Sequence, residues 1–275
     1  MAITNFIPTI WSENLYSALD KKYVAVAHCN REYEGEIKNK GSVVKICGVG
    51  SIDVTDYTKD TDMANPQSLS DTVTELAIDQ AKCFNFQIDD IDRAQCTPRL
   101  MDAAMKVAAD SLANTADKYV FQVAASSDAY KINCGSDAND IIDCVIEARQ
   151  KLYENNVSDT NNVVLEVSPY VGSLLLKGKV LLASDNTDAL ENGCIGKIAG
   201  CKVFITPNIV VDDSDRDHYH KCVMRTTRAI AFAEQLSEID AYRPEKRFAD
   251  AVKGLHIYGA KAVHPEEMVI IDVLT

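Results

Sequence analysis

Hydrophobic and polar residues follow two different periods along the chain, which predicts a mixture of strands and helices. From Phe84 to Asp89 apolar and polar residues alternate, and this period of two is typical of a half-buried strand. Over residues 97–125 apolar residues recur at steps of three and four, as on one face of a helix. Thr97 and Pro98 suit the N-cap and the first helical position. Unbroken, this helix is on the order of 40 Å long, which is long for a globular domain.

Weaker patterns predict further elements on both sides of this helix. Short strands are expected at residues 41–46, 72–78, 163–167, 202–206, 255–258 and 269–273. A second helix opens at Ser136, and a short one is expected at residues 170–176. The buried face of the second helix is expected to hold Ile141, Ile142, Val145, Ile146, Leu152 and Tyr153. Because strands and helices do not alternate in a βαβ rhythm, the predicted fold class is α+β.

Three segments are open to more than one interpretation. Residues 48–69 form a long polar connection between two predicted strands, so they are either a projecting hairpin that needs a partner surface or a mobile loop. Residues 1–30 form a short arm, and an apolar stripe through Trp11 and Leu15 packs either on its own body or on a neighbour. Residues 193–200 are expected to form a loop, and residues 226–237 are a helix by propensity or a strand by context.

Composition narrows the class of protein. The 275 residues are 47% hydrophobic and 25% charged, which is ordinary for a globular protein and excludes a disordered or collagen-like chain. The net charge of -13 repels phosphate and argues against a dedicated nucleic-acid binder, although not against a protein that encloses nucleic acid. Nine cysteines without C-x-x-C spacing indicate reduced thiols. No signal peptide and no membrane span are expected.

Candidate chemistry is sparse, and no catalytic, metal or cofactor residue is predicted. Phosphate-loop, nucleophile-elbow and zinc-protease motifs are missing from the sequence. His218 and His220 follow a run of aspartates and could hold a transition metal, but an acidic loop entering a strand explains the same residues. Lys261 and His264-Pro265 resemble a segment of citryl-lyase-like barrel enzymes. Those enzymes also need magnesium-binding carboxylates and eight βα repeats, which the sequence does not show.

Five segments, in this order, resemble the tailed-bacteriophage major capsid (coat) proteins of the HK97-like fold. They are residues 3–15 (ITNFIPTIWSENL), 30–46 (NREYEGEIKNKGSVVKI), 79–95 (DQAKCFNFQIDDIDRAQ), 193–208 (GCIGKIAGCKVFITPN) and 232–265 (FAEQLSEIDAYRPEKRFADAVKGLHIYGAKAVHP). No single motif is decisive, but their combination spans nearly the whole chain in the order of the family.

The resemblance implies an architecture with four parts. These are an N-terminal arm at 1–33, an extended β-hairpin loop at 34–80, a peripheral domain at 81–126 and 226–275 with a spine helix at 97–125, and an axial domain at 127–225. The hairpin then lies across an adjacent subunit, and the arm packs against a neighbour. The candidate inter-subunit contacts are Trp11, Leu15, Lys45, Ile52, Tyr57, Lys59 and Arg243.

The resemblance also implies a function. The expected protein has no enzymatic activity and self-assembles as hexamers and pentamers into an icosahedral head, which encloses packaged dsDNA without sequence-specific binding. It is expected in the virion after assembly in the host cytoplasm. The expected partners are a separate scaffolding protein, a portal protein and a decoration protein, but no membrane. Some relatives crosslink a Lys to an Asn. Lys45, Lys59 and Lys82 lie in or beside the hairpin, but no residue match assigns that reaction. The alternatives are an encapsulin-type nanocompartment shell and a magnesium-dependent citryl-lyase-like enzyme built around His264.

Overall fold

The fold is known from a computed structural model. It describes residues 19, 22–33, 42–49, 56, 59, 62, 71–89, 100–157, 162–177, 194–212 and 218–275. Of the predicted contact residues, Trp11, Leu15, Ile52 and Tyr57 lie outside this part of the chain, as does the predicted helix cap at Thr97 and Pro98.

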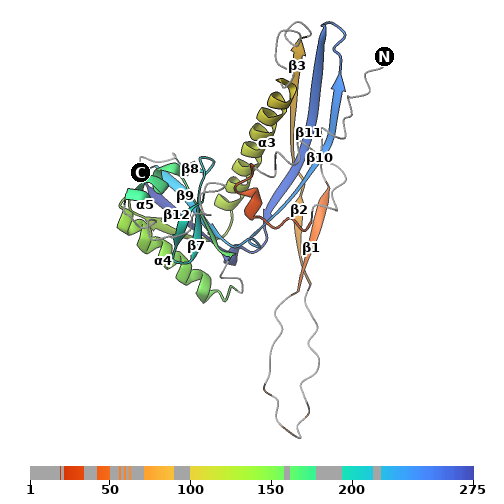
Figure 1. Ribbon diagram of the computed structural model, residues 1–275. Coiled ribbons are helices and arrows are strands. Elements are labelled where there is room, and N and C mark those ends of the chain that lie inside the picture. The colour runs from red at the N-terminus through yellow and green to blue at the C-terminus, as the bar shows by residue number, and fades with distance from the viewer. Residues whose placement is uncertain are drawn as a thin grey trace.

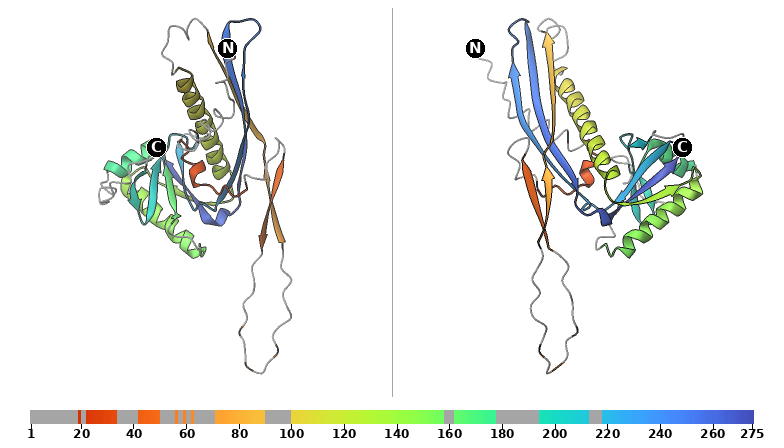
Figure 2. Two further views of the ribbon diagram at one scale, coloured as in Figure 1. Left: turned by 45° about the vertical axis from the view of Figure 1, so that its right-hand side comes forward. Right: turned by 180° about the vertical axis from the view of Figure 1, so that it is seen from behind.

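The longest strands form an antiparallel sheet of three strands, called here the long sheet. Its order is β10 (Ile230–Tyr242), β11 (Ala249–Ala262) and β3 (Gln80–Asp89). Helix α3 (Leu100–Ala125) lies along one face of this sheet (Figure 1, Figure 2). The buried face of α3 is rich in alanine, so the helix backbone approaches the sheet closely while Phe121 and Val120 fill the space between.

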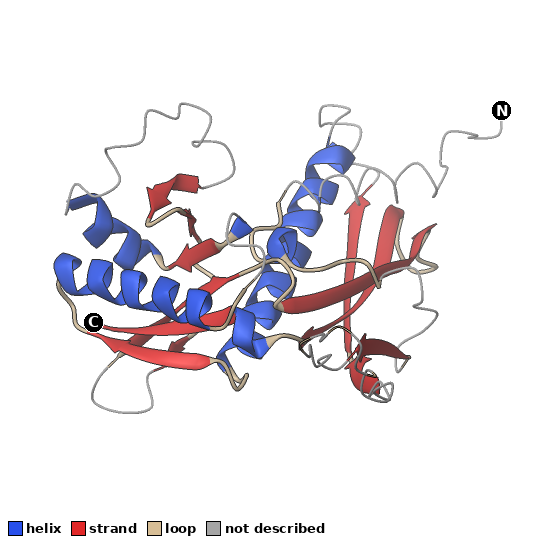
Figure 3. Cartoon of the chain, turned by 90° about the horizontal axis from the view of Figure 1, so that it is seen from below, coloured by secondary structure: helices blue, strands red, loops and turns tan. Residues whose placement is uncertain are grey.

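A second sheet forms a compact body beside the long sheet. Across it run β4 (Tyr130–Cys134), β12 (Met268–Leu274), β9 (Tyr219–Arg225), β5 (Val164–Val167), β7 (Cys201–Ile205) and β6 (Cys194–Ile198), and β8 (Val211–Asp212) pairs with β9. Helices α4 (Ala138–Glu154) and α5 (Pro169–Lys177) cover one face of this seven-stranded sheet, and α3 lies between the two sheets (Figure 3). Side chains of β12 alternate: Val269 and Ile271 face α4 and α5, whereas Met268 and Ile270 join the core beneath α3.

The hairpin of β1 (Val43–Val49) and β2 (Asp71–Ala77) projects from the long sheet, away from the turn that joins β10 to β11 (Figure 1). The two strands pair antiparallel from Val43 with Ala77 to Val49 with Asp71. The hairpin packs on the long sheet through a small apolar cluster. Its buried members are Val44, Ile46, Leu76, Ile78, Ala231, Ala233 and Ile257.

A short N-terminal segment, residues 22–33, contacts the long sheet, the seven-stranded sheet and α3. It contains the 3-10 turn η1 (Val26–His28), and Asn30 forms a parallel bridge with Ala231 at the start of β10. The Asn30 N–H donates to the Ile230 carbonyl at 2.8 Å, and the Phe232 N–H donates to the Asn30 carbonyl at 2.9 Å. The segment therefore passes under α3 first and then extends the edge of the long sheet by one bridge.

The α+β class predicted from the sequence is confirmed. The long helix is observed from Leu100 to Ala125, and residues 226–237 lie mostly in strand β10 rather than a helix. The short strand expected at 255–258 is the middle of the much longer β11. In the seven-stranded sheet β12 pairs with β4 and β9, so residues 268–274 lie with the expected axial part and not with the peripheral one. No helix in the described part of the chain is long and apolar enough to cross a membrane.

Three expectations were wrong or incomplete. Residues 194–198 form strand β6 rather than a loop, because they pair antiparallel with β7 across a tight turn at Ala199 and Gly200. Strand β4 was not predicted, since only its third and fifth residues are buried and the pattern is short. Ile146 and Tyr153 do not lie on the buried face of α4: their exposed fractions are 51% and 54%. They flank the helix face that meets the sheet, and the described residues leave them about half exposed.

Candidate assembly interface

The foot of the hairpin crosses β11 at a glycine. A Cβ atom at Gly259 would lie 2.2 Å from the carbonyl oxygen of Ala77 and 3.1 Å from the Cα of Ile78. Real Cβ atoms do not approach backbone so closely, so this crossing requires a residue without a side chain. Gly259 therefore sets the depth at which the hairpin sits on the sheet and, with it, the direction in which the hairpin projects.

The opposite end of the long sheet carries an exposed aromatic ring among basic side chains. This end, called here the tip, is the turn RPEKRF between β10 and β11. Phe248 is 84% exposed, and Lys246 and Arg247 are exposed beside it. Arg243 forms an ion pair with Asp250, with Nε and Oδ1 3.2 Å apart. A basic and aromatic tip on a chain of net charge -13 is a surface suited to an acidic protein partner.

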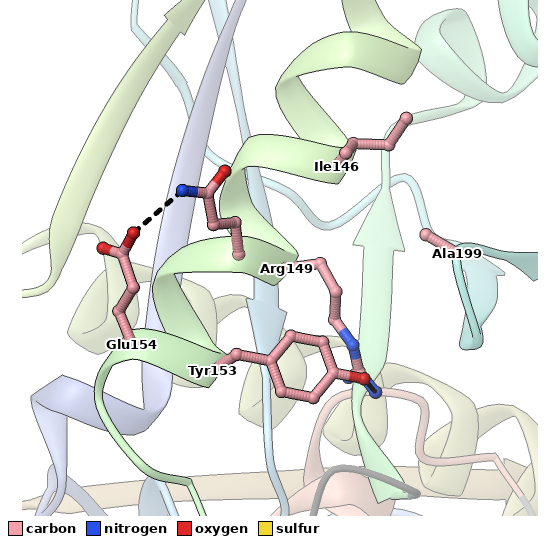
Figure 4. A pocket seen from close by; sticks show the side chains of 6 residues that line it. Ile146, Arg149, Tyr153, Glu154 and Ala199 are labelled. Carbon is pink, nitrogen blue, oxygen red and sulfur yellow. Dashed lines mark hydrogen bonds between the residues drawn. The ribbon is translucent and has the colours of Figure 1, made fainter.

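A groove of about 520 Å³ lies between α4 and the turn that joins β6 to β7 (Figure 4). Its lining residues are Ile146, Arg149, Gln150, Tyr153, Glu154 and Ala199. The Arg149 guanidinium lies 4.8 Å from the centroid of the Tyr153 ring, and its Nη2 donates to the Tyr153 hydroxyl at 3.1 Å. The groove thus presents half-exposed apolar side chains around a cation that is fixed in place by stacking.

Beneath these surfaces, a buried ion pair fastens the N-terminal segment to the seven-stranded sheet. Arg225 and Glu166 have fully buried side chains. The Nε and Nη2 atoms of Arg225 donate to the two carboxylate oxygens of Glu166, each at 2.9 Å. Arg225 also donates to the carbonyls of Ala25, at 2.8 Å, and His28, at 3.1 Å. The pair therefore bridges strands β5 and β9 to the 3-10 turn that sits under α3.

The electrostatics of this cluster keep both groups charged. Burial raises the pKa of Glu166, but Arg225 and the hydrogen bond from His28 outweigh burial and hold the pKa below its usual value. Burial lowers the pKa of Arg225, and the carboxylate of Glu166 more than compensates, so the net shift is upward. A bidentate, hydrogen-bonded pair is the form in which buried charges are tolerated.

Asp117 on α3 fixes the other side of the N-terminal segment. Its carboxylate accepts the backbone N–H groups of Val24, Ala25 and Val26, each at 3.1 Å. Burial raises the pKa of Asp117 to about 6, and the three hydrogen bonds oppose this shift only in part. A carboxyl group whose pKa is raised on folding adds stability below its unfolded pKa and loses it as pH rises through about 6.

Replacing Asp117 by asparagine is expected to remove this pH dependence. Between pH 8 and pH 5 the native protein should gain about 1 kcal/mol of unfolding free energy relative to Asp117→Asn, because only the carboxyl group takes up a proton. Urea unfolding of both proteins at the two pH values measures the difference. A gap between the two proteins that stays the same at pH 8 and pH 5 would contradict the expectation.

The three predicted contact residues that the structure describes do not all lie together within one subunit. Lys45 is exposed on β1, opposite Glu75 of β2, and Lys59 is exposed outside the strands. Arg243 lies at the tip, at the far end of the long sheet from the hairpin (Figure 1). Lys82 is exposed on β3.

Sequence reasoning missed Phe248, Gly259 and the Arg225–Glu166 pair. For Phe248 a usable signal was present, because an isolated phenylalanine follows the charged turn RPEKR. Nothing local distinguishes Gly259, because the backbone that it meets belongs to residues 77 and 78. The ion pair joins residues 59 positions apart, and no pattern in the sequence links them.

The described residues do not assemble the competing chemistries, and the aspartates at 213, 215 and 217 lie outside the described part of the chain. The His220 ring stacks on Tyr170 with centroids 5.6 Å apart, and the His218 carbonyl accepts the N–H of Thr275. His264 directly precedes the 3-10 turn η6 (Pro265–Glu267). Its Nδ1 lies 3.1 Å from a carboxylate oxygen of Glu266 in that turn. Among the described residues no group of three or more His, Cys, Asp and Glu side chains is arranged to hold a metal ion. The separate three- and seven-stranded sheets also differ from the βα barrel of citryl-lyase-like enzymes.

Solved structures, but no sequence family or curated protein, relate the chain to known proteins. Neither a protein-family model nor a curated protein matches the sequence. Among solved structures, a chain from Mycobacterium phage Che8 is 29% identical and superposes with a TM-score of 0.70 over 98% of both chains. The capsid of Ralstonia phage GP4 is 12% identical, with a TM-score of 0.69 over 94% of this chain and 90% of that one.

A third likeness comes from outside the phages. A virus-like particle from Pyrococcus furiosus is 13% identical, with a TM-score of 0.60 over 94% of this chain and 96% of the other. The superpositions cover nearly the whole chain, so they include both sheets. The resemblance seen in the sequence is confirmed by these structures, and the chain has the fold of phage major capsid proteins.

Proposed function

We propose that the chain is the capsid shell protein of a tailed bacteriophage, which assembles as hexamers and pentamers into an icosahedral head around packaged dsDNA. The observation that carries the proposal is the likeness to the Mycobacterium phage Che8 chain over 98% of both chains. The elongated subunit agrees with it. The hairpin at one end of the long sheet and the tip at the other both expose apolar side chains that another molecule can cover.

The proposed contacts between subunits are heterologous, because they join different surfaces of identical copies. The hairpin carries the exposed carboxylates of Asp56, Asp62 and Glu75, whereas the tip is basic. We assign the hairpin of one copy to the tip of the next, with Lys45, Ile52, Tyr57 and Lys59 on the first surface and Arg243 on the second. Such head-to-tail contacts close into rings when the rotation between copies allows it.

The two bodies of the subunit take different places in the proposed ring. The long sheet with α3 forms the peripheral domain, and the seven-stranded sheet forms the axial domain around the five- and sixfold axes. The groove beside Ile146 and Tyr153 is then a contact between axial domains. The N-terminal arm, with Trp11 and Leu15, packs on a neighbour. Many modest contacts per subunit make a stable closed shell, although each contact by itself is weak.

The proposal extends to partners and location. A separate scaffolding protein directs assembly in the host cytoplasm, a portal protein occupies one vertex, and a decoration protein binds the finished head. The mature protein resides in the virion. Its acidic character suits a shell that encloses DNA without gripping it, because tight phosphate binding would hinder packaging.

Imaging of the purified protein by negative-stain microscopy, with and without a scaffolding partner, tests the proposal. The natural protein is expected to form rings or closed shells, and Phe248→Glu is expected to remain as free subunits. Phe248 is 84% exposed, so a charge there removes a contact surface without disturbing the subunit, and Tm should not change. Val107→Glu is the matched control, because Val107 is 65% exposed on α3. A natural protein that stays monomeric both with and without the scaffolding partner would contradict the proposal.

A protein nanocompartment shell is the second candidate, favoured by the likeness to the virus-like particle from Pyrococcus furiosus. The two candidates differ in what the particle contains. Particles isolated from the native source should hold double-stranded DNA if the chain is a phage shell and a protein cargo if it is a nanocompartment. Nuclease treatment after particle disruption, followed by gel analysis of protein and nucleic acid, separates them.

A further inference from the structure

Three cysteines lie near one another where α4 packs on the seven-stranded sheet. Cys134 is the last residue of β4, Cys222 lies on β9, and Cys144 is on the second turn of α4. Cys134 and Cys222 belong to the buried cluster between the sheet and its helices, and Cys144 packs against that cluster. All three are free thiols.

The connection from β4 to α4 folds back tightly and brings two of these thiols into contact. Only residues 135–137 separate the strand from the helix. A Cβ atom at Gly135 would lie 2.4 Å from a carboxylate oxygen of Asp140, which shows how closely the first turn of α4 approaches the strand end. The thiols of Cys134 and Cys144 are hydrogen-bonded to each other across this connection. Cys222 is a more distant neighbour of Cys134.

The two thiols differ in access. Cys134 is buried, whereas Cys144 is half-buried at the surface of α4. Burial and the neighbouring thiol of Cys144 raise the pKa of Cys134, and burial raises the pKa of Cys222 to about 12. A raised pKa makes a thiol slow to attack a disulfide in solution, but Cys134 is already in contact with the Cys144 sulfur that it would attack. An external oxidant therefore meets Cys144 first.

We propose that Cys134 and Cys144 are a redox-sensitive pair that closes into a disulfide when the protein meets a low-molecular-weight disulfide such as oxidised glutathione. The Cys144 sulfur, after losing its proton to water, attacks the glutathione disulfide, whose S–S bond breaks, and one glutathione leaves as a thiolate. The Cys134 sulfur then loses its proton, attacks Cys144 and displaces the second glutathione. Two protein thiols are oxidised to one disulfide, and one glutathione disulfide is reduced to two thiols.

The disulfide would link the end of β4 covalently to α4. It closes a loop short enough to form readily, and it removes conformational freedom from the unfolded chain. The inference does not depend on the shell assignment. In any protein that is made in a reducing compartment and later released from it, such a pair of thiols remains reduced during folding and forms the disulfide after release.

The sequence makes the test unusually direct. Trypsin cleaves after Lys131 and Arg149, and the peptide between these cleavage sites contains Cys134 and Cys144 and no other cysteine. The folded natural protein is incubated with oxidised glutathione, alkylated without reduction, digested and analysed by mass spectrometry. The expected peptide has lost two hydrogen atoms and carries no alkyl group, and Tm should rise by about 5 °C.

Two variants and one control complete the design. In Cys144→Ser the rise in Tm should disappear and the peptide should be alkylated once, at Cys134. In Cys134→Ala the rise in Tm should also disappear, and Cys144 should keep a bound glutathione, because no second thiol is present to displace it. Cys83→Ser is the control, because Cys83 is an exposed thiol on β3 and its loss should leave the bond intact. A natural peptide that is alkylated twice, a Cys134–Cys222 bond, or a glutathione held stably on Cys144 of the natural protein would each overturn the proposal.

Discussion

Arg225→Met is expected to destabilise the subunit by about 3–5 kcal/mol, because it leaves the buried Glu166 carboxylate without its counter-charge. The substitution also removes the donors to the carbonyls of Ala25 and His28, so the N-terminal segment loses its hold on the sheet. A domain of this kind has about 5–15 kcal/mol of stability in total. Urea unfolding of the natural protein and the variant measures the loss, and poor soluble yield is expected at 37 °C.

Two further variants separate charge burial from lost packing. Arg225→Met combined with Glu166→Leu removes both charges and should recover a large part of the lost stability. Lys22→Met breaks an exposed ion pair with Asp110, in which Nζ and Oδ1 are 3.3 Å apart, and should cost no more than about 1 kcal/mol. If Arg225→Met and Lys22→Met cost the same, the buried pair does not hold the two parts of the subunit together.

Gly259→Ala is expected to block shell formation while leaving the two main bodies of the subunit folded. The new methyl group would overlap the Ala77 carbonyl oxygen, which belongs to the backbone and cannot turn aside. The hairpin must lift from β11, and overpacking of this kind costs about 1–3 kcal/mol. Because the hairpin is assigned to a contact with a neighbour, a displaced hairpin should remove particles from negative-stain images while circular dichroism remains native-like.

Gly254→Ala on the same strand is the matched control. A Cβ atom there would lie 2.4 Å from the Phe84 ring, and a side chain can shift where backbone cannot. Shells should therefore still form, with only a modest fall in Tm. Normal shells from Gly259→Ala would show that the seat of the hairpin on β11 does not control assembly.

Local pattern was sufficient wherever an element is stabilised mainly by its own periodicity. The alternation at residues 84–88 and the three- and four-residue steps of the long helix both led to elements that the structure contains. The strands expected at 41–46 and 72–78 are present, and the structure pairs them as one of the two open interpretations of their connection required. The order of five segments was enough to indicate the fold, since each segment contributed a little and the whole chain agreed.

Local pattern failed where burial depends on a neighbour distant in sequence. Ile146 and Tyr153 have helical spacing suited to a core, yet they lie beside the buried face of α4 and stay about half exposed. Residues 194–198 became a strand because β7 offers a partner across a tight turn, and residues 230–242 because β11 does. Propensity within a segment cannot decide such cases, because the energy comes from the partner strand.

The sequence alone predicted the α+β class, the long helix, the two strands of the hairpin and the family resemblance. These features depend on periodicity and on the order of segments along the chain. Only the tertiary structure showed that Arg225 meets Glu166, that Gly259 lies under the hairpin, and that Phe248 stands uncovered at the tip. These are relations between residues far apart in the chain. A buried charge or a crossing of two backbones is determined by which surfaces come together, and no single stretch of sequence records that.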